Sequence, residues 1–314
     1  MTLLEKIASF ENLMQAFHEC SRGKRKSSGY QRAMFALGER LMHIRKKLLT
    51  DTYKWNGYRE MIVKDPKTRL VMAAPFIDRV VHTAIHRILE PILETYLSPS
   101  VYACRENKGN RYAALDLLNN LKIYGEQRFV IKLDVRKYFE SIQHDILVKQ
   151  IFSILPDYSV AHLLISLLAN YPRYANRGYG IPIGNLSSQL FANFYLVPVD
   201  NIALKEINDG FYFRYMDDMI VGGRSKKNIL DTTDKMITCA SKELKLNIPF
   251  EKKMPFGNGP IPFLGYVLDQ TGYTVLARNR RRQAKRINRL IKSNAKLSEI
   301  AMRELSFEAF AHLV

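Results

Sequence analysis

The chain has 314 residues, 47% of them hydrophobic and 25% charged, and its 48 Lys and Arg against 30 Asp and Glu give a formal net charge of +18. This composition is that of a folded protein and excludes a disordered tail, a collagen-like chain and a low-complexity chain. The length favours about two domains or one large multi-part domain. The charge indicates a polyanionic partner, with nucleic acid ahead of an anionic membrane surface.

The first half of the chain contains helices and one hairpin. Residues 1–21 and 31–50 have helical patterns, separated by the basic, Gly/Ser-containing stretch Ser21–Gly29. Residues 58–76 alternate apolar and polar side chains around a Lys-Asp-Pro-Lys turn, which predicts a β-hairpin. Asp78 then begins a helix whose apolar residues follow the 3.6-residue period of a packed face.

The second half mixes strands and helices. The predicted elements are a strand at 129–134 running into a helix near Lys137, an apolar helix at 158–171, a Gly- and Pro-rich stretch from Gly178 to Gly184, a long apolar helix from near Asn185, two half-strands within 211–223, a helix at 226–245 and a second hairpin at 261–276. We find neither an internal repeat nor a linker long enough to separate independent domains. This order favours an α+β fold.

Cysteine usage and the N-terminal sequence indicate the compartment. Cys20, Cys104 and Cys239 stand far apart without a CxxC pair, so we expect packed thiols in a reducing compartment. The first 17 residues contain two acids and lack the basic start and apolar block of a signal peptide. No apolar run approaches the roughly 20 residues that cross a bilayer. We therefore expect a cytosolic protein with no membrane partner.

Residues 270–298 contain nine Lys and Arg and no acid. If this segment is helical, the apolar side chains form only a narrow stripe and the bases cover the rest. A solvated helix face is the alternative interpretation. Because nine like charges repel one another unless they are neutralised, the segment predicts binding to a phosphate backbone.

Asp217 and Asp218 lie between two apolar half-strands, in the sequence Tyr-Met-Asp-Asp. Taken alone, this pair could be a plain hairpin turn. Hairpin turns prefer Asn-Gly or Asp-Gly, however, and adjacent carboxylates repel each other unless a cation is bound. Asp134, at the end of the predicted strand 129–134, is either a helix N-cap or a third carboxylate facing the same point. Three converging carboxylates would suit two Mg²⁺ ions, which prefer hard oxygen ligands.

Two other patterns are excluded as sites. His82 and His86 are spaced as zinc ligands can be on a helix, but the glutamate of HExxH is missing and no third ligand is evident, so we expect structural or surface roles. The segment GNLSSQ has one glycine and does not match GxxxxGK[ST], so it is not a nucleotide-binding P-loop.

Four segments occur in order: DVRKYF (134–139), IPIGNLSSQLFANFYL (181–196), YMDD (215–218) and FLGY (263–266). They resemble, respectively, the first catalytic motif, the template- and nucleotide-positioning motif, the motif with the other two metal-binding acids and the primer-gripping hairpin of reverse transcriptases. Upstream, KDPKTRLVMAAPFIDRVVHTAI and VYACRENKGN resemble the fingers segments of the group II intron-like bacterial branch.

The resemblance implies an α+β right-hand polymerase fold with a short C-terminal helical thumb. Fingers would comprise 1–125 with a contribution from 149–178, the palm 126–148 and 179–274, and the basic thumb 275–314. It also implies an RNA-directed DNA polymerase that binds template RNA, the cDNA primer–template duplex and dNTPs.

The resemblance assigns site residues as well. Asp134 and Asp217 would bridge two Mg²⁺ ions, with Asp218 a weaker or indirect ligand and Val135 in the metal-binding set. Phe139 would exclude a ribose 2′-hydroxyl, although core packing suits it equally. The residues assigned to the nucleotide are Arg69, Arg105, Phe139, Ile183, Gly184, Gln189 and Lys252, the last of which a solvated surface role would also explain. Those assigned to template and primer are Phe263, Leu264, Gly265, Tyr266, Arg278, Arg281, Arg282, Lys285, Arg286 and Arg289.

One departure from the group II pattern indicates a subfamily. Group II intron enzymes usually read Gln-Gly-x-x-x-Ser-Pro where this chain has Ile183-Gly184 and then Gln189 in place of Pro. This variant resembles the enzymes of diversity-generating retroelements, which make errors at adenines and work with a small basic helical accessory protein. The resemblance implies the cytoplasm of a bacterium, with the gene carried either by the bacterium or by its phage. The alternatives are a defence-associated bacterial reverse transcriptase and, remotely, a non-catalytic RNA-binding protein.

Overall fold

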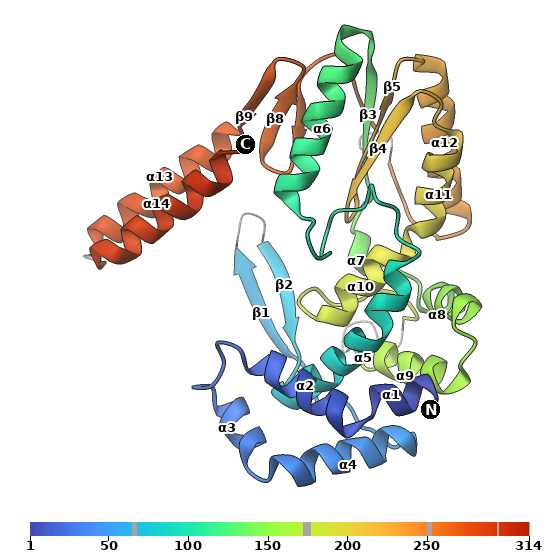
Figure 1. Cartoon of the computed structure of the whole chain (residues 1–314), viewed down its shortest axis with the longest axis vertical. Helices are drawn as coiled ribbons and strands as arrows, with labels where there is room; N and C mark the ends of the chain where they lie inside the picture. Colours follow the sequence, from blue (N-terminus) through green and yellow to red (C-terminus); the bar gives the residue numbers. More distant parts are fainter. Residues whose placement is uncertain (65–67, 172–176, 250–252, 294, 314) are drawn as a thin grey trace. The chain divides into compact units, whose positions relative to one another are not determined.

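The computed structural model describes residues 1–64, 68–171, 177–249, 253–293 and 295–313 (Figure 1). The chain divides into two compact units. The first comprises Met1–Ser98, Arg136–Asp200 and Thr238–Asn247, and the second comprises Pro99–Val135, Asn201–Ile237 and Ile248–Val314. None of the helices in the described ranges is both long and apolar enough to cross a bilayer.

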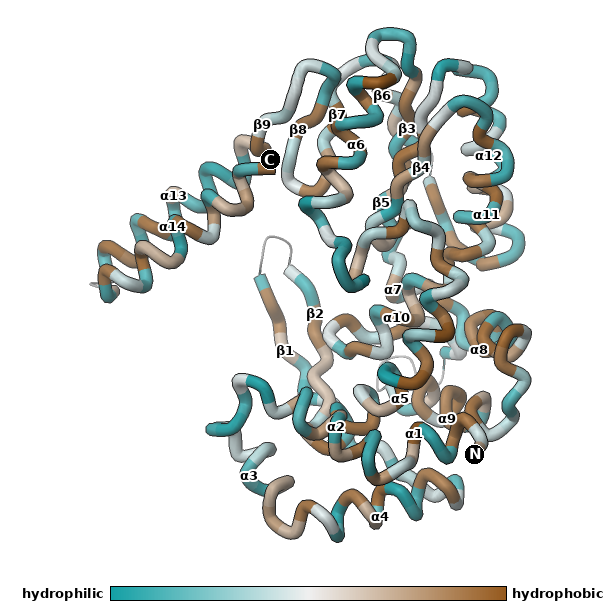
Figure 2. Tube along the Cα trace, in the orientation of Figure 1, coloured by the Kyte–Doolittle hydropathy of each residue, from teal (hydrophilic) through white to brown (hydrophobic). Residues whose placement is uncertain are grey.

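The first unit is mainly helical. Its helices are α1 (Leu3–Ile7), α2 (Phe10–Ser21), α3 (Ser28–Met34), α4 (Leu37–Leu49), α5 (Phe76–Glu94), α7 (Tyr138–Ser141), α8 (His144–Ile154), α9 (Tyr158–Ala169) and α10 (Leu186–Tyr195), and its strands β1 (Arg59–Lys64) and β2 (Thr68–Ala73) form an antiparallel hairpin. Helices α2 and α10 pack against α5, most of whose apolar side chains are buried. Figure 2 shows α8 and α9 as largely hydrophobic, and the loop between α2 and α3 as hydrophilic.

The two N-terminal helices expected from periodicity are each divided. The Ser9 side chain accepts the Asn12 backbone N–H at 3.1 Å and so begins α2, and this cap breaks the helix expected over 1–21. The helix expected over 31–50 breaks at Ala36, whose φ of 52° is left-handed. Both predictions of one continuous helix were wrong because the apolar period continues across each break.

Buried polar side chains fix α5. Asp78 accepts hydrogen bonds from the Tyr53 hydroxyl at 2.7 Å and from the Asn56 backbone N–H at 2.7 Å. His82 makes contacts through both ring nitrogens, Nδ1 with Ser187 Oγ at 2.7 Å and Nε2 with the Tyr58 hydroxyl at 3.0 Å. His82 is therefore a buried structural residue, as expected.

The second unit is built around a four-stranded antiparallel sheet. Its strands are β3 (Phe129–Asp134), β4 (Gly210–Tyr215), β5 (Asp218–Gly223) and β6 (Met254–Gly257), in the order β4-β5-β3-β6. A three-stranded sheet follows, made of β7 (Ile261–Phe263), β8 (Tyr266–Asp269) and β9 (Gly272–Val275). The helical segments are α6 (Asn110–Tyr124), the 3-10 turn η1 (Gly125–Gln127), α13 (Ala277–Lys292) and α14 (Leu297–Ala311), while α11 (Val197–Glu206) and α12 (Lys226–Lys242) continue across the boundary between the units.

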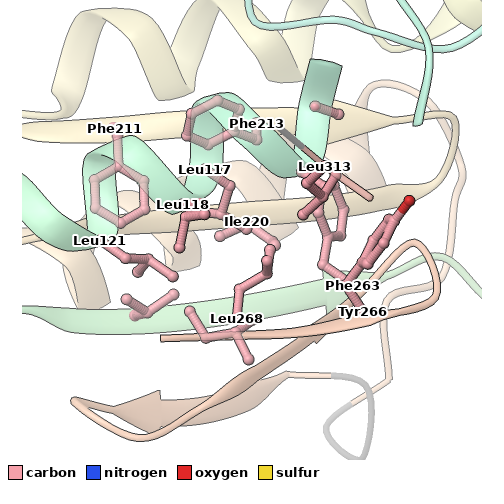
Figure 3. Packing of buried hydrophobic residues seen from close by; sticks show 14 of the residues in the cluster. Leu117, Leu118, Leu121, Phe211, Phe213, Ile220, Phe263, Tyr266, Leu268 and Leu313 are labelled. Carbon is pink, nitrogen blue, oxygen red and sulfur yellow. The ribbon is translucent and has the colours of Figure 1, made fainter. Parts of the chain in front are cut away.

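One face of the four-stranded sheet forms the core of the second unit (Figure 3). Leu117, Leu118 and Leu121 of α6 pack there with Phe211, Phe213 and Ile220 of the sheet, Phe263, Tyr266 and Leu268 of the small sheet, and Leu313. Gly222 leaves room for this packing, because a Cβ there would lie 2.3 Å from the Phe211 ring. Burial of this face fixes β3, β4 and β5 side by side.

Several elements of this unit differ from the expectation. The hairpin expected at 261–276 is a three-stranded meander, and the strand β6 and the helix α6 were not foreseen. The expectation of packed thiols holds for Cys239, which is buried, but is wrong for Cys104, which is exposed.

Candidate active site

Asp134, Asp217 and Asp218 lie at one end of the four-stranded sheet. Asp134 is the last residue of β3 and Asp218 is the first of β5, and the two are direct register partners. Asp217 occupies the two-residue turn that joins β4 to β5, next to Met216. The predicted pair of half-strands is thus a β-hairpin formed by β4 and β5. The pairing of β3 with β5 brings Asp134 to the acidic turn.

The turn has an unusual backbone. Met216 has a φ of 54°, in the left-handed region that non-glycine residues adopt at a cost of roughly 1 kcal/mol or more. Its carbonyl accepts a hydrogen bond from Nη1 of Arg214 at 3.3 Å, and the Arg214 side chain is fully buried. A buried guanidinium therefore supports the turn that presents Asp217.

The carboxylates act on one another. Burial, as the largest cause, and the charges of Asp134 and Asp218 together raise the pKa of Asp217 to about 6. The carboxyl groups of Asp134 and Asp217 are close enough to share a hydrogen bond. The donor set consists entirely of carboxylate oxygens, which are the ligands that Mg²⁺ prefers. The site thus has the chemistry and the excess negative charge to hold a divalent cation.

Asp218 differs from its two neighbours because its Oδ1 lies 3.0 Å from the Nζ of Lys132. Within the part of the chain that the structure describes, no three His, Cys, Asp or Glu side chains converge closely enough to enclose a metal ion. Asp134 and Asp217 share a side-chain hydrogen bond, whereas Asp218 pairs with Lys132. Sequence reasoning did not identify Lys132, although it stands two residues before Asp134 and so shares its face of β3.

Arg105 lies in a loop anchored to β4. Its Nη1 donates to the Val101 carbonyl at 2.8 Å, and Val101 forms a parallel bridge to Arg214. The Tyr102 backbone N–H also donates to the Arg214 carbonyl at 3.0 Å. Arg105 is thereby held on the segment that pairs with the strand leading to the acidic turn.

Within the first unit, the structure brings together several of the other candidates. The Met72 backbone N–H donates to the Ile183 carbonyl at 3.2 Å, which fixes the Ile183–Gly184 turn against β2. Gly184 has a φ of +115°, and a Cβ there would lie 2.7 Å from Val71 Cγ1. The Phe139 carbonyl accepts the Ile181 N–H at 2.7 Å, so the half-buried Phe139 adjoins the same stretch.

The remaining candidates are Arg69 on β2, Gln189 on α10, Val135 after β3, and Lys252. Arg69 is exposed on β2, where it pairs in register with Val63. Gln189 is half-buried on α10. Val135, which follows Asp134, is buried. Lys252 lies outside the described residues.

The FLGY segment is mostly core. Phe263 and Tyr266 are 1% and 0% exposed, and the Tyr266 hydroxyl donates to the Phe310 carbonyl at 2.6 Å. Leu264 and Gly265 form the turn between β7 and β8, with φ angles of 48° and 100°. A primer contact by this segment would therefore come from the turn and its backbone, rather than from the two aromatic rings.

Helix α13 displays most of the predicted bases. Arg278, Arg281, Lys285 and Arg289 are exposed, whereas Arg282 and Arg286 are half-buried, and α13 has no buried residue. The Leu276 N–H donates to the Gly265 carbonyl at 2.9 Å, so the start of this helix is fixed to the FLGY turn.

Comparison with known proteins identifies the fold. Residues 62–268, about two-thirds of the chain, match the family model described as reverse transcriptase (RNA-dependent DNA polymerase). The chain belongs to the reverse transcriptase family. The match contains the three acids, Lys132 and the FLGY segment, and it leaves out helices α1–α4 and α13–α14.

Curated relatives of this reverse transcriptase are similar at low identity. It is 26% identical over 174 residues to the putative COX1/OXI3 intron 1 protein of Saccharomyces cerevisiae, with 52% of this chain and 20% of that protein aligned. It is also 26% identical over 174 residues to the group II intron-encoded protein LtrA of Lactococcus lactis, with 53% and 28% aligned. The match therefore spans less than a third of each relative.

Solved structures support the expected architecture. The apo telomerase of Candida tropicalis superposes with a TM-score of 0.53 at 11% identity, covering 69% of this chain and 48% of the telomerase. A likeness at this identity concerns the fold alone. Together with the family match and the mixed helix and sheet content, it fits the predicted right-hand polymerase fold.

Proposed function

We propose that this protein is an RNA-directed DNA polymerase that copies a template RNA into cDNA by nucleotidyl transfer with two Mg²⁺ ions. The observation that carries the proposal is that Asp134, Asp217 and Asp218 lie at one end of the sheet, where their charges act on one another and the pKa of Asp217 is raised. A protein that only bound RNA would gain nothing from carboxylates held close enough to repel each other. Repelling carboxylates are useful where cations bind between them.

In this proposal the primer 3′ oxygen bonds to the α-phosphorus of a dNTP, and the bond from that phosphorus to the bridging oxygen breaks to release pyrophosphate. Mg²⁺, when bound, neutralises the triphosphate and lowers the pKa of the primer 3′-hydroxyl. Asp134 and Asp217 would hold the two ions. Arg69 and Arg105 bind the triphosphate oxygens, for which a guanidinium is suited. The Phe139 ring excludes a ribose 2′-hydroxyl.

The fingers, palm and thumb would follow the boundaries given above, with the basic α13 in the thumb. Template RNA and the primer–template duplex would bind along α13, where six Arg and Lys side chains are exposed. Recognition there would depend on the shape of the duplex and its 2′-hydroxyls more than on sequence.

We further propose that the enzyme belongs to a diversity-generating retroelement and acts with a small basic helical accessory protein. Ile183 stands where group II enzymes have Gln, and an aliphatic side chain discriminates poorly between base pairs where a polar one can reward correct geometry. Errors at template adenines would follow from that loss.

Primer extension on a defined RNA template with four dNTPs and Mg²⁺ tests both the polymerase activity and the assignment to a diversity-generating retroelement, with Asp217→Ala as the control. Extension that the variant loses, with errors concentrated opposite adenines, supports the full proposal. Extension with an evenly low error rate supports the polymerase proposal and favours the alternative that the enzyme is a defence-associated reverse transcriptase. If extension stays absent after an accessory protein and the native template are supplied, the polymerase proposal fails.

A further inference from the structure

Lys132 makes a contact that the proposed reaction does not account for. On β3 it lies two residues before Asp134 and therefore on the same face of the sheet, diagonally across from Asp218 on β5. Its Nζ is 3.0 Å from Asp218 Oδ1, and the two side chains are 12% and 30% exposed. An ammonium group is thus built into the acidic end of the sheet.

The same ammonium group is also bound to the small sheet. Lys132 Nζ donates to the Pro262 carbonyl at 3.3 Å and lies 5.8 Å from the centre of the Phe263 ring. These two residues end β7, immediately before the Leu264–Gly265 turn. A largely buried ammonium is tolerated when such partners replace its water shell. The Lys132 side chain therefore links Asp218 to the strand that leads into the FLGY turn.

This link has two physical consequences. The Lys132 charge attracts the Asp218 carboxylate toward itself, and it opposes any cation that approaches Asp134 and Asp217. It also fixes β7 relative to the acids, because the Pro262 carbonyl and Asp218 share one donor group. A neutral side chain at position 132 would remove the first effect, and a side chain without a donor would remove both.

We propose that Lys132 is a positioning residue that keeps Asp218 from serving as a full metal ligand, weakens divalent-cation binding by its charge, and couples the acidic site to the FLGY turn. This inference rests on the proposed function, since it concerns the metal site of that reaction. The Lys132 charge thus weakens cation binding, while the Lys132 contacts fix the positions of Asp134, Asp217 and the FLGY turn.

Three variants separate the charge from the link. Lys132→Arg keeps the charge and the donor, Lys132→Gln keeps a donor for the Pro262 carbonyl without the charge, and Lys132→Met removes both. Mn²⁺ binding is measured by calorimetry on the whole protein without nucleic acid. The affinity for a DNA primer on an RNA template is measured by fluorescence anisotropy, and kcat and KM for dNTP by primer extension.

We expect Lys132→Gln and Lys132→Met to bind Mn²⁺ about 3- to 10-fold more tightly than the native protein, because one opposing charge has gone. Lys132→Arg should stay within about 2-fold of the native value. Primer–template affinity and kcat should fall most in Lys132→Met, by about 10-fold, and less in Lys132→Gln, which still reaches Pro262. The KM for dNTP should change little in either variant.

Unchanged or weaker Mn²⁺ binding in folded Lys132→Gln would overturn the inference, and thermal unfolding establishes that the variant is folded. If Lys132→Met does not fold, the comparison of Lys132→Gln with Lys132→Arg decides alone. The native protein and the Lys132 variants could bind Mn²⁺ in the expected order of affinities while the native protein extends no primer. That result would refute the proposed polymerase and leave the inference about Lys132 standing. A native protein that binds no Mn²⁺ would refute both.

Discussion

Asp134 and Asp218 are register partners on the antiparallel strands β3 and β5. Their separation is therefore set by backbone pairing in the centre of a packed sheet, and the third acid, Asp217, follows from the short turn between β4 and β5. Sites built on strands hold their side chains more precisely than sites on loops. Repulsion among these acids is consequently a cost that the rest of the sheet has to offset.

Asp217→Asn should abolish primer extension and yet stabilise the metal-free protein. The amide removes the charge that burial and the two neighbouring carboxylates disfavour. Since Asp217 is partly exposed, solvent screens some of the repulsion, and we expect the free energy of unfolding in EDTA to rise by about 1 kcal/mol. Urea unfolding measures it. Asp145→Asn, at an exposed acid on α8, is the control, and a loss of stability in Asp217→Asn would contradict the idea.

His82 should make the fold sensitive to acid. Burial lowers the pKa of His82 to about 3, so below its usual value of 6.5 the unfolded chain binds a proton that the folded one does not. The contribution of neutral His82 to the free energy of unfolding is therefore complete above pH 6.5. It falls by up to about 1.4 kcal/mol per pH unit as the pH drops toward 3.

Unfolding measured at several pH values between 7.5 and 4.5 tests this in His82→Gln. The variant should be less stable at pH 7.5, because the contacts to Ser187 and Tyr58 are lost, but its stability should fall less steeply with acid. Tyr58→Phe removes one contact and keeps the imidazole, so it should retain the native slope. Equal slopes in native protein and His82→Gln would rule out His82 as the source.

Neutralising exposed bases of α13 should weaken duplex binding. Arg281→Gln and Lys285→Gln each remove one charge from a helix that has no buried residue, so the fold should be little affected. If each contacts a phosphate, the slope of log affinity against log salt should fall by about 1 per substitution. Anisotropy titrations of an RNA–DNA duplex in increasing NaCl measure this, with Lys149→Gln on α8 as the control. An unchanged slope would remove α13 from the interface.

Sequence alone predicted the local features of this site well. The strand at 129–134 matches β3 residue for residue, Asn185 is the N-cap of α10, and Asp134 is the register partner of Asp218, because strand pattern and turn are encoded over a few neighbouring residues. The expected convergence of three carboxylates around one metal position is not found among the described residues. The ion pair of Lys132 could not be predicted, since it depends on the register of β3 with β5 and on the position of β7. The helix breaks at Ser9 and Ala36 were also missed, but their cause is local. At each position the backbone leaves the helix while the apolar period of the sequence continues past it.

Ile183→Gln is expected to raise fidelity at template adenines. The Ile183 carbonyl is held by the Met72 N–H at 3.2 Å, so the substitution changes the side chain while the backbone of the turn stays fixed. If residue 183 adjoins the nascent pair as we propose, a Gln side chain would add a donor and an acceptor there, and a polar contact of that kind can improve discrimination by about 10-fold or more. Sequencing of cDNA made from one template gives the error rate at each base. Ile183→Leu keeps an aliphatic side chain and should retain the native error rate, so equal adenine errors in Ile183→Gln and Ile183→Leu would place the source of infidelity elsewhere.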